Sequence, residues 1–220
     1  QTTGSSDYDA GINLSPDGSI VDQSVIMADV QMNADSITGR WAQKVILAGI
    51  AEVPVLGFQE TDTIGLSLVK IEEVGGQLSA SINVCQTLIQ RPDDIVVTEI
   101  PNSFISSIPT YYRTIFRDQD GVYFSRLAEL NGVRLSDVIN EELPTSANDP
   151  RVFDQDEDGY PGVTVFVSGL ISGKIYLIQR TVTQMEGNLE NGRLIGEIDW
   201  SITESILGSD EEFLEMGAPL

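Results

Sequence analysis

The sequence contains no histidine and a single cysteine, Cys85, and these scarcities restrict its chemistry. Without histidine the chain lacks the most common general base and the most common transition-metal ligand. With one cysteine it can form neither an intrachain disulfide nor a cysteine-rich zinc site. Ser-His-Asp catalysis, Cys-His catalysis and His-zinc chemistry are therefore excluded. Since no other catalytic cluster is recognisable, we expect a protein that is not an enzyme.

Positive charge is also scarce, because 12 Lys and Arg residues stand against 34 Asp and Glu residues, a net charge of −22. Such a surface repels phosphate backbones and anionic lipids, so we expect no nucleic-acid partner and no membrane-surface role. It attracts divalent cations, although acidic surfaces are equally typical of saline or extracellular settings. No apolar run approaches the roughly 18–20 residues of a membrane helix, so no transmembrane segment is expected.

The composition changes early in the chain. Residues 1–18 are rich in Gly, Ser, Asp and Thr, which predicts a polar N-terminal tail. Residues 19–220 are expected to form a single β-rich domain, because all-β domains of this length are commonly undivided. The polar start at Gln1 is typical of a mature chain after processing.

Short apolar runs separated by Gly- and Asp-containing turns predict an all-β, mainly antiparallel fold, barrel-like or a sandwich, with one short helix. Gly75-Gly76 joins two such runs in a hairpin, because both central positions of a tight primed turn need positive φ. The second arm, 78–88, alternates apolar and polar residues and places Cys85 on the polar face. The helix is expected over 134–142, where Ser136 is a candidate N-cap. The other predicted strands are 37–53, 64–71, 111–116, 122–127, 163–168, 174–183 and 193–203.

An acidic loop, Asp154-Gln155-Asp156-Glu157-Asp158-Gly159, carries the clearest chemical signal. Asp at positions 1, 3 and 5 lets three carboxylates converge on one centre, and Gly at position 6 allows a sharp turn. Hard oxygen ligands of this kind suit Ca²⁺. We therefore predict a calcium site formed by Asp154, Asp156 and Asp158, with a backbone carbonyl from Tyr160 at position 7.

The loop is not an EF-hand, because position 12 is Val165 instead of Glu and a Val-rich strand follows at once. The remaining ligands must come from elsewhere, and Asp149 is one candidate. The alternative is a solvated acidic turn, since Asp and Gly dominate turns in general. Three adjacent like charges are unfavourable without a cation, which favours the metal site. The shorter segment 118–121 (Asp-Gln-Asp-Gly) is interpreted as a plain hairpin turn.

Gly39-Arg40-Trp41 opens the first clear strand and resembles the G-x-W signature at the start of lipocalin barrels. The resemblance implies a closed barrel that carries a small hydrophobic ligand. The alternative is that Trp41 simply fills one end of an ordinary core.

A second resemblance rests on the run Asp-Gln-Asp-Glu-Asp-Gly-Tyr-Pro-Gly-Val-Thr-Val at 154–165, followed by Ile-Tyr-Leu-Ile-Gln-Arg at 175–180 and Gly-Arg-Leu-Ile-Gly at 192–196. These segments are similar to uncharacterised exported proteins or lipoproteins of Gram-negative bacteria, over roughly residues 150–208. The resemblance implies an exported protein that is periplasmic, associated with the outer membrane or extracellular. It also implies that a lipid-bearing cysteine could precede Gln1.

Together these observations favour a non-enzymatic, calcium-stabilised β-domain of the cell envelope or exterior. Its expected role is that of a structural or partner-binding subunit, with a protein partner or self-assembly. A lipocalin-like carrier of a small hydrophobic ligand is the alternative. Glycoside hydrolysis by two carboxylates about 5–10 Å apart stays open as a third reading, because 34 acidic residues do not by themselves single out a pair.

Overall fold

A computed structural model shows an all-β protein with one short helix, which confirms the predicted fold class. The structure describes residues 23–29, 36–53, 57–90, 96–119, 121–170 and 172–211. All the pairings between its named strands are antiparallel. The elements are β1 (Gln23–Asp29), β2 (Gly39–Val53), β3 (Gly57–Val74), β4 (Gln77–Gln90), β5 (Val96–Glu99), α1 (Asn102–Ser107), β6 (Tyr111–Arg117), β7 (Val122–Asn131), β8 (Val163–Gly169), β9 (Gly173–Glu190) and β10 (Arg193–Ser209).

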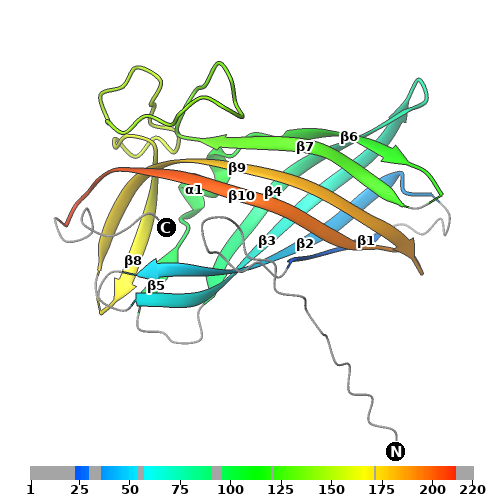
Figure 1. The fold of residues 1–220 in the computed structure, drawn as a ribbon, viewed down its shortest axis with the longest axis horizontal. Coiled ribbons are helices and arrows are strands. Elements are labelled where there is room, and N and C mark those ends of the chain that lie inside the picture. The colour runs from blue at the N-terminus through cyan, green and yellow to red at the C-terminus, as the bar shows by residue number, and fades with distance from the viewer. Residues whose placement is uncertain are drawn as a thin grey trace, which may run out of the picture.

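The ten strands form one sheet in the order β10-β1-β2-β3-β4-β6-β7-β9-β8-β5 (Figure 1). β10 also pairs with β9, so eight of the strands are linked in a circuit of pairings. The 18-residue β9 makes this possible, because its first part pairs with β8 and its later part with β7. Among the described strands, β8 and β5 branch from the circuit, and β5 is the last strand in the order. The sheet as a whole is therefore open at this edge, and neither a simple closed barrel nor a sandwich of two separate sheets describes it.

Two clusters of buried apolar side chains stabilise the sheet. The larger one draws on strands from β2 to β10 and includes Trp41, Ile71, Ile115 and Met185. The smaller one lies between the branch and α1, with Phe104 from the helix packed against valines of β8 and against Leu177 of β9. Because the second cluster covers the start of β8, it fixes the strand that follows the acidic loop.

The β3–β4 hairpin forms as predicted around Gly75 and Gly76, which have φ values of 61° and 81°. Its alternation, however, changes partway along β4. Leu66 pairs with Gln86 and Ser67 with Val84, so Cys85 is an extra residue in a bulge. The bulge reverses the faces beyond it, and Leu88 becomes 38% exposed where the sequence pattern predicted it on the apolar face.

The helix expected over 134–142 is absent, and that segment forms turns. The backbone N–H of Glu141 bonds the Asp137 carbonyl, but the turn does not continue, and Ser136 gives its backbone N–H to Glu141 Oε2 instead of capping a helix. The short helix is α1, inside the region 90–109 that contains three of the nine prolines.

Trp41 is 1% exposed and belongs to the larger cluster, and its indole N–H donates to the Ile37 carbonyl at 2.9 Å. Its position is that of a core residue. The predicted tail, residues 1–18, lies outside the described residues. Within the described part of the chain, no helix has the length and apolar character needed to cross a membrane.

Candidate metal centre

The acidic loop lies in the long connection between β7 and β8. This connection lies at one end of the sheet (Figure 1). Two isolated bridges hold the connection together, one between Val133 and Val152 and one between Asp154 and Gly162. Around the second bridge, the Gln155 N–H donates to the Gly162 carbonyl at 2.9 Å, and the Gly162 N–H donates to the Phe153 carbonyl at 3.1 Å. The acidic loop is therefore closed at its base by backbone bonds.

Gln155, between the first two aspartates, anchors the loop to the rest of the fold. Its Oε1 accepts a bond from the Gly132 N–H at 2.7 Å, and its Nε2 donates to Ser107 Oγ and to Asn131 Oδ1 at 3.2 and 3.3 Å. It thus ties the loop to the end of β7 and to α1. Sequence reasoning missed this role, because the partners lie 23–48 residues away in the chain.

The structure brings the three predicted carboxylates together. One oxygen from each of Asp154, Asp156 and Asp158 can be chosen so that all three lie within 4.8 Å of one another. The Asp154 carboxylate also accepts bonds from the Asp158 and Gly159 N–H groups, and Asp158 Oδ1 accepts one from the Tyr160 N–H. These local bonds hold the cluster in a shape that could bind a metal ion.

Asp156 is the buried member of the cluster, at 8% exposure, whereas Asp154 and Asp158 are exposed. Its Oδ2 accepts a bond from the Thr164 N–H at 3.1 Å, but its Oδ1 is buried and has no hydrogen-bond partner. Burial, followed by the nearby negative charges of Asp158 and Asp154, raises the pKa of Asp156 above its ordinary value. A cation at this point would supply what Oδ1 lacks and offset the repulsion.

Thr164 joins the cluster to β8 and was not singled out from the sequence. Its side chain is almost fully buried, its N–H bonds Asp156, and its hydroxyl donates to Asp158 Oδ2 at 2.6 Å. Because Thr164 is the second residue of β8, the position of the carboxylates and the start of the strand depend on each other.

Tyr160 lies at the edge of the cluster. Its ring stacks on Tyr176 of β9, with centroids 4.2 Å apart, and the Lys174 ammonium lies 5.5 Å from the Tyr160 ring centroid. Burial, with a hydrogen bond that the Tyr176 hydroxyl donates to Tyr160 as the next cause, raises the pKa of Tyr176 to about 12. The ring contacts fix Tyr160 against β9, while the use of its carbonyl as a metal ligand stays a prediction.

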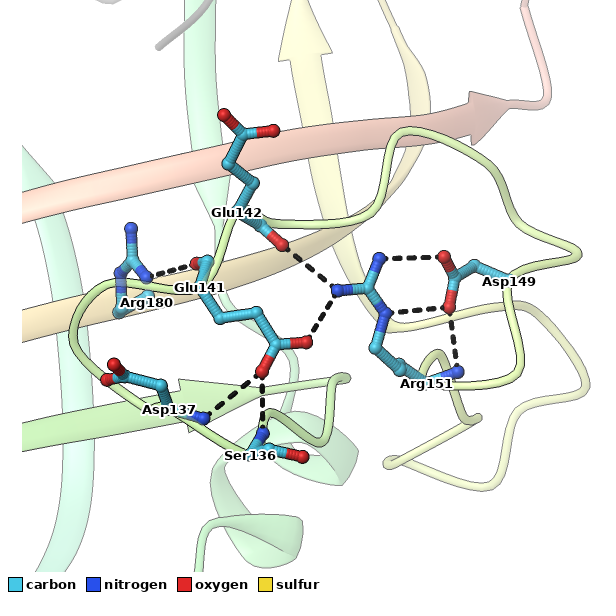
Figure 2. A network of polar contacts seen from close by, with 7 residues as sticks. All are labelled: Ser136, Asp137, Glu141, Glu142, Asp149, Arg151 and Arg180. Carbon is cyan, nitrogen blue, oxygen red and sulfur yellow. Dashed lines mark hydrogen bonds and ion pairs between the residues drawn. The ribbon is translucent and has the colours of Figure 1, made fainter.

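Asp149, considered above as a further ligand, is engaged elsewhere. Both of its oxygens accept bonds from the Arg151 guanidinium, at 2.8 and 3.0 Å, in the network of Figure 2. The same arginine bonds Glu141 Oε1 at 2.8 Å, and Arg180 donates to the Glu141 carbonyl. These bonds hold the first part of the connection and hold the pKa of Asp149 at about 2. Any further metal ligands are therefore expected from carbonyls or water.

The turn at Asp118 forms as interpreted from the sequence, with the Gly121 N–H donating to Asp118 Oδ1 at 3.1 Å between β6 and β7. Within the described residues, the group of Asp154, Asp156 and Asp158 is the one acidic cluster with metal-binding geometry.

Comparisons with family models, curated proteins and solved structures give no match for this chain. The function of the chain is therefore inferred from the chemistry of the site.

Proposed function

We propose that the Asp154–Asp156–Asp158 cluster binds Ca²⁺ and that the chain acts as a non-enzymatic, calcium-stabilised β-domain. The observation that carries the proposal is the buried, unpartnered Asp156 Oδ1 beside two further carboxylates. An unpartnered carboxylate oxygen in such a place costs free energy, and a bound cation would remove that cost.

The ligand chemistry favours calcium over other metals. The cluster offers only oxygen donors, which suit hard cations, and the absence of histidine removes the ligand that zinc and copper prefer. Mg²⁺ demands near-octahedral geometry, whereas Ca²⁺ accepts six to eight ligands in flexible arrangements. A loop that supplies three carboxylates and leaves places for water or carbonyls suits the larger ion.

The role proposed for the ion is structural. It would neutralise the negative charge of the loop and strengthen the link through Thr164 to β8. β8 belongs to the branch that has β5 as its last described strand. A site of this kind suits the exterior of the cell, where weak calcium sites with dissociation constants of about 10⁻⁴–10⁻³ M are found in extracellular modules. An exported subunit that binds a protein partner or assembles with itself fits this picture and the strongly acidic composition.

The test is thermal unfolding with Ca²⁺ and with excess EGTA, in the wild type and in Asp156→Asn. A metal at 100 times its dissociation constant stabilises by about 2.7 kcal/mol, which raises the Tm of a chain of this size by roughly 5–11 °C. We expect Asp156→Asn to lose this gain, and to be at least as stable as the wild type in EGTA because a buried charge is removed.

Asp118→Asn is the matched control, because it changes an aspartate of a similar tight turn outside the cluster. It should keep the full calcium gain. Equal Tm values with Ca²⁺ and EGTA in the wild type would refute the site. Sedimentation in both conditions tests the assembly role, and a strict monomer indifferent to chelation would contradict it.

A further inference from the structure

A group of cations stands out on the surface of β2 and β3. Arg40, Lys44 and Lys70 are exposed, and Leu68 beside them is 58% exposed. Leu68 pairs with Ala42, which lies between the two cations of β2, so the four side chains form one block. We call Arg40, Lys44, Leu68 and Lys70 the basic patch. It gathers three of the 12 cations of a chain that has 34 acidic residues.

The basic patch lies on the outer face of the sheet. Successive side chains of a strand point to opposite faces, and Trp41 and Val69, which alternate with the patch residues, belong to the buried core. The patch is also poorly neutralised within the chain. Arg40 lies directly opposite Lys70, and like charges at opposite positions repel. Lys70 pairs with Glu72 at 2.6 Å, but both side chains are half exposed, and such pairs contribute little.

A group of the opposite sign lies on the outer face of β9 and β10. Glu186, Glu197 and Asp199 are exposed, and Ile195 is 40% exposed, while the alternating residue Ile198 is in the core. We call Glu186, Ile195, Glu197 and Asp199 the acidic patch. Glu186 pairs with Glu197, so two carboxylates lie directly opposite each other. None of the three acids forms an ion pair with a described cation.

The two patches are complementary in charge and in composition. One has three cations beside an exposed leucine, and the other has three carboxylates beside an exposed isoleucine. Each contains a pair of like charges that repel within one chain and would gain opposite charges in a contact between the patches. The same contact would cover two exposed aliphatic side chains. Complementary charge across an interface guides the encounter and fixes how the partners align.

The two patches point in different directions on one chain. Their centres are three strand positions apart in the circuit of eight strands, and these strands enclose the larger core cluster. A second copy that places its acidic patch on the basic patch therefore leaves one free patch on each copy. Such a head-to-tail contact can repeat, and it gives a ring or a filament.

We propose that the basic patch binds the acidic patch of a second copy of this chain. The contact rests on the self-assembly role proposed above and not on the calcium site. The net charge of −22 opposes association at long range. At physiological salt that repulsion is screened beyond about 8 Å, whereas charges that touch across the two patches are closer than this. A different acidic protein on the basic patch is the competing occupant.

The test is sedimentation velocity of the calcium-loaded full chain over a wide range of concentration, at an ionic strength of about 0.15 M. The mass of the wild type should rise with concentration. Arg40→Glu should raise the concentration needed for assembly about tenfold or more, because a carboxylate would then face the acidic patch. The same change keeps the fold, since it places opposite charges at the paired positions 40 and 70.

Arg126→Glu is the matched control. It reverses an exposed arginine of β7 outside both patches and gives the same net charge as Arg40→Glu. It should assemble like the wild type.

Two double variants test the pairing of the patches directly. Arg40→Glu with Lys70→Glu, and Glu186→Lys with Glu197→Lys, should each be monomeric alone, because patches of the same sign would meet. An equimolar mixture of the two should assemble, since each variant offers the sign that the other needs.

A wild type that assembles while Arg40→Glu and Arg126→Glu behave alike would overturn this contact and leave the self-assembly role in place. A mixture of the double variants that stays monomeric would overturn it in the same way. A wild type that is monomeric at every concentration would overturn both the contact and the self-assembly role, whereas the calcium-dependent Tm tests the metal site separately.

Discussion

Two glycines, one in the acidic loop and one just after it, have similar φ values but different surroundings, and this contrast makes a sharp prediction. Gly159 and Gly162 have φ values of 90° and 85°, a region that residues with a side chain rarely adopt. A Cβ on Gly159 would meet nothing within 4 Å. A Cβ on Gly162 would overlap the Leu177 carbonyl, with its carbon at 2.9 Å and its oxygen closer still.

The expected magnitudes follow from these surroundings. Gly159→Ala should cost only the backbone strain, about 1–3 kcal/mol. Gly162→Ala should cost the same strain and also push the loop away from β9, for a total of about 4 kcal/mol or more. The second variant also endangers the bonds of Gly162 to Gln155 and Phe153, which close the base of the loop. Against a total stability of about 5–15 kcal/mol, only the second change threatens the fold.

The measurement is urea unfolding of both variants and the wild type in excess EGTA, which removes any effect of a bound metal. The midpoint of unfolding should fall modestly for Gly159→Ala and steeply for Gly162→Ala, with the slope of the transition unchanged. Equal losses in the two variants would refute the reasoning, because the close approach of Gly162 to Leu177 would then contribute nothing.

Three other variants probe the rest of the structure. Arg151→Met should lower the Tm at pH 7, and its difference from the wild-type Tm should shrink as the pH falls toward 2. The reason is that Arg151 lowers the pKa of Asp149, so the stability that this ion pair contributes is lost when Asp149 is protonated. Tm measured between pH 7 and 2 checks this, and a constant difference would contradict it. Glu204→Gln should stabilise the chain more at pH 7 than at pH 4. Burial raises the pKa of Glu204, so the wild type loses stability as the pH rises through the raised pKa and the buried carboxyl group ionises. Urea unfolding of both proteins at pH 7 and pH 4 checks this, and an equal effect of the substitution at both pH values would argue against it. Trp41→Phe should cost about 1–3 kcal/mol in urea unfolding, because the Ile37 carbonyl loses its donor, and a loss near zero would show that this bond is unimportant.

The sequence was informative wherever neighbouring residues decide the structure. The Gly75-Gly76 turn formed as predicted because positive φ is a property of those two residues. The convergence of Asp154, Asp156 and Asp158 was predictable for the same reason, since alternate side chains of a tight loop face one centre. The all-β class followed from short apolar runs and their turns.

Contacts between distant segments decided the rest. The bulge at Cys85 depends on how β4 pairs with β3, and it reverses a face that the alternation alone assigned otherwise. Asp149 is adjacent to the loop in sequence, but Arg151 takes both of its oxygens.

The clearest division concerns the buried charged groups. The sequence determined that three carboxylates would meet, but only burial against β8 made Asp156 the member with an unpartnered oxygen. The buried ion pair between Arg113 and Glu129 has no local signature, because the two residues lie on β6 and β7 and meet only when these strands pair. Short segments of the sequence determine the local backbone geometry, whereas burial and long-range pairing exist only in the folded chain.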